Sequence, residues 1–150
     1  MIDLELEGGG AASEAALAAL ESRFGPLPED YKAFLKANDG AEPNADHVVH
    51  YDLDGEKGAG GVAIRRFEKA EDIPATVDQI EGWDASYLPF AFDSSGNYFC
   101  FHLKTQEACV WDHDINAYIK VADGFSGFLD VIEAFDLDEF LKSRRQDQSL

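Results

Sequence analysis

The sequence predicts an α+β domain, in which a mostly antiparallel sheet of about four to six strands packs with N- and C-terminal helices. Three patterns support this fold. Apolar residues recur at helical spacing near the N-terminus, four short strand-like runs occupy residues 88–122, and a helical stripe follows from residue 125. No linker rich in glycine, proline or serine divides residues 1–150. We therefore expect a single domain, with residues 142–150 as a frayed tail.

Two short amphipathic helices are expected before residue 41. Ser13 is a suitable N-cap for the first, and Gly25-Pro26 ends its run of regularly spaced apolar residues. Pro28 suits the first position of the second helix and is followed by two acids that complement the helix dipole. The segment Asn38-Asp39-Gly40 is expected to end this helix in a left-handed turn.

The region between residues 41 and 85 has a weaker pattern. Residues 47–51 and 62–67 are expected to form short strands. The glycine- and acid-rich residues 52–61 are expected to form a flexible loop between them. Residues 68–85 are ambiguous: Ile73-Pro74 is expected to break any helix, because proline lacks the N–H that a helix interior needs, whereas Val77 and Ile80 suggest one more helical turn.

The clearest strand pattern covers residues 88–92, 98–103, 108–113 and 118–122, which short loops join into an antiparallel meander. With residues 104–107 as a loop, Cys100 would face Trp111 and Cys109 would face His102. A tighter loop could align the two sulfurs, but Lys-Thr is a poor two-residue turn. We expect both cysteines to be reduced packing residues.

The strongest helical periodicity lies after the meander. One apolar stripe contains Phe125, Phe128, Leu129, Ile132 and Phe135. Asp136 can cap a further helix, with Glu139 in the capping-box position. The C-terminal part of the chain is therefore expected to be helical.

Acidic residues outnumber basic ones by 30 to 12, which gives a formal net charge of −18. Direct binding to nucleic acid or to an anionic membrane is not expected, because both require Lys and Arg. Complementary charge favours a basic protein partner, although acidity can also serve solubility alone. No apolar run reaches the roughly 20 residues that span a bilayer, and the N-terminus lacks a secretory pattern, so we expect a cytoplasmic protein.

Three acidic segments are candidates for a site. Asp112, His113 and Asp114 could hold a metal, but strand alternation would direct the two carboxylates away from the imidazole. Residues 93–97 include serines without a base in reach, so we interpret them as a hairpin turn. Residues 52–57 lack the ligand pattern of a calcium loop, and we interpret them as a solvated loop that can contact a partner. We expect no catalytic residue, no cofactor and no metal.

Four segments occur in the order and spacing of a known family. They are residues 27–40 (LPEDYKAFLKANDG), 88–100 (LPFAFDSSGNYFC), 110–114 (VWDHD) and 125–129 (FSGFL). Together they resemble the SUKH superfamily of SMI/KNR-like proteins, from about residue 13 to residue 141. Asp39 stands where this family commonly has Gly, and Gly127 stands where it commonly has Glu.

The resemblance implies an SMI/KNR-like α+β fold without a cofactor or a catalytic constellation. Many bacterial members are similar to immunity proteins, which bind and neutralise a cognate toxin that is often a nuclease. Eukaryotic relatives resemble adaptors in cell-wall and signalling networks.

The resemblance and the charge lead to the hypothesis of an immunity-type protein of a bacterial polymorphic or contact-dependent toxin system. It would be a monomer or weak dimer that neutralises a basic toxin, of the nuclease class, encoded nearby. The acids expected to contact this partner are Asp52, Asp54, Glu56, Asp93, Asp112 and Asp114. Two alternatives are an adaptor or regulatory scaffold, and a metal-dependent hydrolase around residues 112–114.

Overall fold

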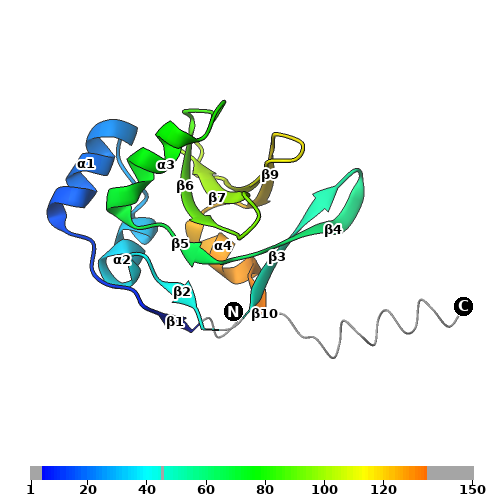
Figure 1. Cartoon of the computed structure of the whole chain (residues 1–150), viewed down its shortest axis with the longest axis horizontal. Helices are drawn as coiled ribbons and strands as arrows, with labels where there is room; N and C mark the ends of the chain where they lie inside the picture. The colour runs from blue at the N-terminus through cyan, green and yellow to red at the C-terminus, as the bar shows by residue number, and fades with distance from the viewer. Residues whose placement is uncertain (1–4, 45, 135–150) are drawn as a thin grey trace, which may run out of the picture.

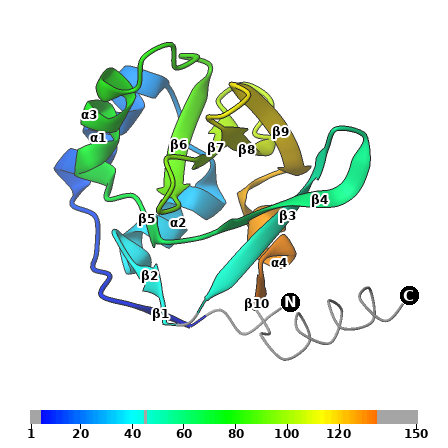
Figure 2. The same cartoon turned by 45° about the vertical axis from the view of Figure 1, so that its right-hand side comes forward.

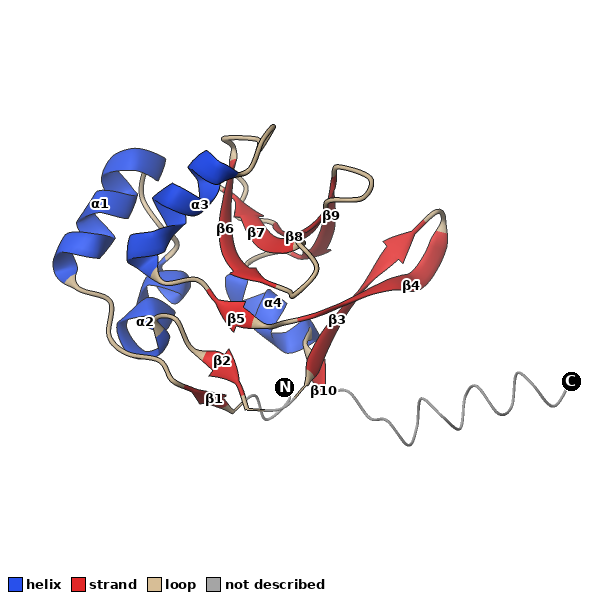
Figure 3. Cartoon of the chain, viewed as in Figure 1, coloured by secondary structure: helices blue, strands red, loops and turns tan. Residues whose placement is uncertain are grey.

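The computed structural model describes residues 5–44 and 46–134, whose helices and strands form an α+β fold (Figure 1). Helices α1, α2 and α3 gather at one side of the molecule, and the β3–β4 hairpin extends from the opposite side (Figure 3). The helices are α1 (Glu14–Phe24), α2 (Glu29–Asn38), α3 (Ile73–Gln79) and α4 (Phe125–Val131), with a 3₁₀ turn η1 (Ala70–Asp72) before α3. No helix among these residues is long and apolar enough to cross a membrane.

The ends of the N-terminal helices follow the sequence signals. The Ser13 hydroxyl accepts a hydrogen bond from the Ala16 N–H at 3.1 Å and thereby caps α1. Gly25 follows α1 with a φ of 89°, a conformation that L side chains adopt rarely. Pro28 was expected at the first position of α2, but it lies one position earlier, as the N-cap. Both expected N-terminal helices are therefore confirmed.

The main sheet is the expected antiparallel meander. Its strands are β5 (Arg66–Phe67), β6 (Tyr87–Phe92), β7 (Tyr98–His102), β8 (Ala108–Asp112) and β9 (Ala117–Ala122), which pair in chain order. The expected strand at residues 62–67 is divided between two sheets, since its first residues end β4 and its last form β5.

One face of this sheet packs against helices α2 and α4. Phe90, Phe99 and Phe101 are at most 1% exposed and point toward these helices. Tyr31 of α2 contacts Phe101 edge to face with ring centroids 5.2 Å apart, and Phe128 of α4 contacts Phe90 at 4.7 Å. This aromatic layer is the centre of the hydrophobic core.

The other face carries a smaller aromatic cluster. Trp83, from the connection between α3 and β6, contacts Trp111 and Tyr118 at ring-centroid distances of 5.4 Å. Its indole N–H donates to the Tyr87 carbonyl at 3.0 Å, which fixes the ring over the sheet. The connection thus covers part of the face that the helices leave free.

The β7–β8 loop closes one residue earlier than expected. Cys100 pairs directly with Cys109, so the expectation that it faces Trp111 is wrong. Gln106 adopts a φ of 68° and donates its N–H to the His102 carbonyl at 2.8 Å. The His102 Nδ1 accepts two further N–H groups of the loop. Both thiols are free, and burial raises the pKa of each.

Residues 52–61 form an ordered hairpin, so the expectation of a flexible loop is wrong. Strands β3 (His47–Leu53) and β4 (Glu56–Ala63) pair along their length, and the hairpin lies next to β9 (Figure 2). Asp54 and Gly55 have φ values of 53° and 80°. Positive φ at both central residues is typical of the tight turns that match strand twist.

Short strands complete the fold at the other end of the hairpin. Strand β10 (Glu133–Ala134) pairs with β3, and β1 (Leu6–Glu7) pairs with β2 (Glu42–Pro43). Helix α4 therefore ends earlier than the apolar stripe indicates, since Ile132 is extended and leads into β10. The expected positions of Phe135, Asp136 and Glu139, and the expected tail, lie outside the described residues.

Helix α3 begins where a break was expected. Pro74 lies in its first turn, where the missing N–H leaves no hydrogen bond unmade. Arg23 of α1 forms a bidentate ion pair with Asp78 of α3, which joins the two helices. Pro74 therefore marks the start of a helix and not the end of one, because proline disfavours helix interiors but is tolerated in the first turn.

Candidate functional site

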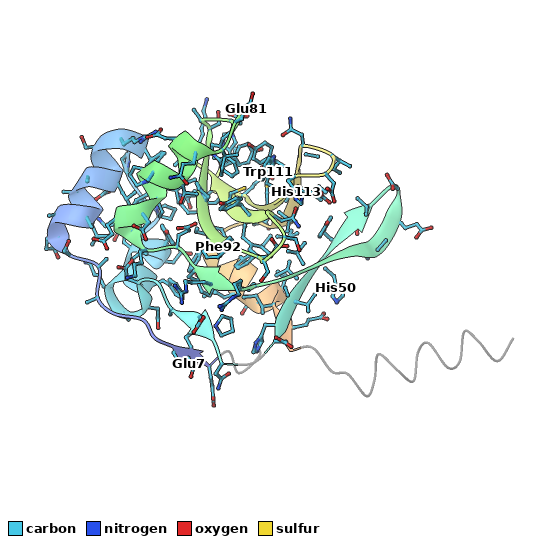
Figure 4. The ribbon with its side chains drawn as sticks, viewed as in Figure 1. Glu7, His50, Glu81, Phe92, Trp111 and His113 are labelled. Carbon is cyan, nitrogen blue, oxygen red and sulfur yellow. The ribbon has the colours of Figure 1, made fainter. Side chains whose placement is uncertain are left out.

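An open acidic hollow lies between the β3–β4 hairpin and the loops that follow β6 and β8. Its volume is about 520 Å³, and its lining includes the carboxylates of Asp93, Asp112 and Asp114. Neither Lys nor Arg occurs among the described residues that line it. His113 lies at the side of the sheet nearest the hairpin (Figure 4). We call this feature the acidic hollow.

Asp112 forms the buried floor of the acidic hollow. Asp112 is 7% exposed, and both of its carboxylate oxygens accept hydrogen bonds from the chain. The Tyr51 hydroxyl donates to Oδ2 at 2.8 Å, and the Asp114 N–H donates to Oδ1 at 3.0 Å. Burial, and secondly this hydrogen bond, raises the pKa of Tyr51 to about 12. The hairpin and the sheet are thereby joined through a satisfied carboxylate.

A glycine of β4 makes room for this arrangement. A Cβ placed on Gly60 would lie 2.5 Å from the Tyr51 ring, far inside van der Waals contact. At the adjacent Gly61 the nearest heavy atom would be 3.4 Å away. The backbone of β4 can therefore approach the Tyr51 ring only because residue 60 has no side chain.

Asp93 holds the β6–β7 turn together, as the turn interpretation predicts. Its Oδ1 accepts the N–H groups of Ser95 (2.9 Å) and Asn97 (2.8 Å). Asn97 in turn accepts the His113 N–H at 3.0 Å, and its Oδ1 lies 2.6 Å from His113 Nδ1. This chain of contacts fixes two loops of the acidic hollow relative to each other.

The structure brings together only part of the predicted contact set. Asp93, Asp112 and Asp114 line the acidic hollow, whereas Asp52, Asp54 and Glu56 lie exposed at the far end of the hairpin. Asp52 accepts the Gly58 N–H at 2.9 Å and so supports the hairpin turn.

Residues 112–114 do not follow strand alternation, so that part of the argument against a metal is wrong. Strand β8 ends at Asp112, and the next four residues form a turn in which Asn116 has a φ of 49°. One ligand atom each of Asp112, His113 and Asp114 lies within 4.8 Å of the others. Because Asp112 already accepts two hydrogen bonds and the group includes no fourth ligand, this geometry does not favour a closed metal site.

Two further residues of this region were missed by sequence reasoning. Tyr51 donates a hydrogen bond from the hairpin to Asp112 and orients its carboxylate. The signal that could have predicted the position of Tyr51 is Asp54-Gly55, because Asp-Gly is typical of two-residue hairpin turns. Ile115 is 53% exposed at the β8–β9 turn, directly after Asp114. An exposed large apolar side chain beside a carboxylate suits contact with another protein.

Comparison with known protein families gives a match over most of the chain. The family described as SMI1/KNR4 (SUKH-1) matches residues 11–131, which include every element from α1 to α4. None of the curated proteins matches the chain significantly.

Proposed function

The chain belongs to the SMI1/KNR4 family (SUKH-1), and from this premise we propose that it is an immunity-type protein that binds and neutralises a basic protein toxin encoded beside it. The observation that carries the proposal is the acidic hollow, a preformed concave surface without Lys or Arg in its lining. A nuclease toxin fits this surface, because it needs basic residues to bind phosphates. Covering those residues would exclude the nucleic acid.

The acids of the proposed interface have different roles. Asp112 is held rigidly by Tyr51 and supplies fixed negative charge at the floor. Asp114 is exposed and can meet a Lys or Arg of the partner, although one of its carboxylate oxygens lies 3.2 Å from His113 Nε2, while Ile115 offers apolar contact area. Asp54 and Glu56, at the exposed end of the hairpin, would act at the rim, where charges accelerate encounter more than they strengthen binding.

No catalytic step is part of this proposal. Among the described residues, neither Ser94 nor Ser95 of the acidic hollow forms a hydrogen bond to a base, and the buried carboxylate of Asp112 already accepts hydrogen bonds from the chain itself. Neutralisation therefore requires binding alone, in a cytoplasm where the toxin would otherwise act.

The direct test is calorimetry of the full chain with the polymorphic toxin encoded by the adjacent gene. Tight binding that weakens as salt rises is expected, since exposed charges are screened beyond about 8 Å at physiological ionic strength. If the adjacent gene encodes no toxin, or the toxin does not bind, the proposal fails. Binding to a host regulator instead would favour the adaptor role.

A variant with three neutralised acids tests whether the acidic hollow and the hairpin end contact the toxin. The variant carries Asp54→Asn, Glu56→Gln and Asp114→Asn, all at exposed positions. We expect association to slow by about tenfold at low salt, because the attractive field at the site is reduced.

The matched control removes the same charge from exposed positions elsewhere. It carries Glu14→Gln, Glu81→Gln and Asp130→Asn. Equal rates for the two triple variants, measured by stopped flow, would place the interface outside the acidic hollow.

A further inference from the structure

A second open cavity lies on the other side of the β6–β7 turn. Its volume is about 450 Å³, and it is bounded by the connection after β5, by helix α3 and by the facing ends of β6 and β7. Glu68 lines it and is only 7% exposed. Its backbone N–H donates to the Phe90 carbonyl at 2.8 Å, which fixes the residue beside β6.

The Glu68 carboxylate is poorly compensated by the chain. Its one hydrogen bond within residues 5–44 and 46–134 comes from the Thr76 hydroxyl at 3.4 Å, a long contact. Burial, and secondly the charge of Asp72, raises the pKa of Glu68 to about 7. The other ionisable groups that face it are the phenols of Tyr31 on α2 and Tyr98 on β7, whose pKa values burial and then Glu68 raise. Arg66 and Lys69 also line the cavity, but no Lys or Arg of the described residues forms an ion pair with Glu68.

Two basic residues, Arg66 and Lys69, line the cavity, and the described contacts of both are with other parts of the chain. The Arg66 guanidinium lies 3.6 Å from the Glu42 carboxylate. The Lys69 side chain lies against Gly40, since a Cβ there would be 2.6 Å from Lys69 Cγ. The chain therefore has cations at hand but does not direct them at Glu68, although a buried carboxylate normally requires a charged partner.

Two aromatic rings complete the cavity. Phe92 and Tyr98 both line it and are half-buried, with ring centroids 6.3 Å apart and an interplanar angle of 53°. Figure 4 shows Phe92 near β5, at the end of β6. Aromatic faces attract cations, and guanidinium binds them best because it is planar and weakly hydrated.

We propose that this cavity binds a guanidinium group, with the Glu68 carboxylate as its ionic partner and the Phe92 and Tyr98 rings as its walls. The ligand is an arginine side chain of a protein partner or a free arginine-like compound. This assignment does not depend on the toxin, because it rests on the Glu68 cavity and not on the acidic hollow.

The test uses N-acetyl-L-arginine methylamide as the probe and the full chain with ¹³C-labelled glutamate. The probe is expected to bind at millimolar concentration and to lower the Glu68 titration midpoint seen by NMR, because it favours the charged carboxylate. Glu68→Gln is expected to weaken probe binding by about tenfold or more, because it removes the charged acceptor for the guanidinium. The control is Glu71→Gln, an exposed neighbour outside the cavity.

Several outcomes overturn the proposal: an unmoved Glu68 signal at 20 mM probe, equal binding by Glu68→Gln, or equal binding of the corresponding lysine derivative. Phe92→Leu keeps the carboxylate and is expected to reduce binding about threefold, which preserves the test if Glu68→Gln does not fold. Tighter binding of free L-arginine than of the blocked probe supports a small-molecule ligand, and the reverse supports a protein arginine.

Discussion

Asp112 and Glu68 are buried to the same extent, each 7% exposed, but the fold treats their carboxylates differently. Asp112 accepts hydrogen bonds from the Tyr51 hydroxyl and the Asp114 N–H at 2.8 and 3.0 Å. Glu68 accepts one long hydrogen bond, from Thr76, and its pKa rises to about 7. Burial therefore does not by itself identify a binding group. The difference lies in whether the chain itself supplies the hydrogen bonds that a buried carboxylate needs.

The largest stability effect is expected at the satisfied carboxylate. Asp112→Ala leaves the Tyr51 hydroxyl buried without its acceptor and removes two hydrogen bonds to a charged group. We expect a loss of about 3–4 kcal/mol in the free energy of unfolding, measured in urea. Asp112→Asn keeps an acceptor and should lose less. A cost below about 0.5 kcal/mol for Asp112→Ala would mean that Asp112 does not join hairpin and sheet.

The opposite sign is expected at the unsatisfied carboxylate. Because its folded pKa is raised, the folded state keeps the Glu68 proton between about pH 4.5 and 7 while the unfolded state loses it. The wild-type chain therefore loses stability as pH rises through this window, by about 3 kcal/mol.

Glu68→Gln removes this pH dependence, so it should stabilise the chain at pH 8 relative to wild type and have a smaller effect at pH 5. Thermal unfolding at both pH values measures the difference, with Glu71→Gln as the exposed control. A variant that is less stable than wild type at pH 8 would show that the charged carboxylate has partners of its own.

Gly60 and Gly61 of β4 test how closely the hairpin supports Asp112. Gly60→Ala places a methyl group 2.5 Å from the Tyr51 ring and should cost about 1–3 kcal/mol, because the ring and its hydrogen bond must shift. Gly61→Ala, whose nearest contact is 3.4 Å, should be nearly neutral. Equal unfolding free energies for the two variants would contradict the close approach at residue 60.

The smallest stability effect is expected at Ile115, where a role in partner binding can be distinguished from a role in folding. Ile115→Ser alters a side chain that is 53% exposed, so the free energy of unfolding should change by less than about 0.5 kcal/mol. If Ile115 contacts the partner, the same variant should weaken binding by about tenfold, because apolar anchors at interfaces lose more than exposed charges do. Unchanged binding in calorimetry would restrict the interface to the acids.

Local signals were predicted well wherever a single segment decides its own conformation. Ser13 caps a helix, and turn formers after Phe92 join two strands of the meander. The Asp54-Gly55 turn was equally local, but the acidic composition of its neighbours led to the expectation of a loop. The predicted pairing of Cys100 was wrong for a different reason. The His102 imidazole accepts N–H groups of the β7–β8 loop and supports the observed loop conformation, and strand alternation carries no information about this contact.

The amino-acid sequence by itself determined the fold class, the meander and the family, because periodicity, turn chemistry and motif order are properties of neighbouring residues. It also determined the −18 charge. Only the tertiary structure decided which acids share a surface and which buried carboxylate receives hydrogen bonds from the chain. Tyr51 reaches Asp112 across 61 positions, whereas Glu68 lines a cavity together with Arg66 and Lys69 but forms no ion pair with either of them. Hydrogen bonding and desolvation act through space, so their outcome depends on packing that sequence spacing does not specify.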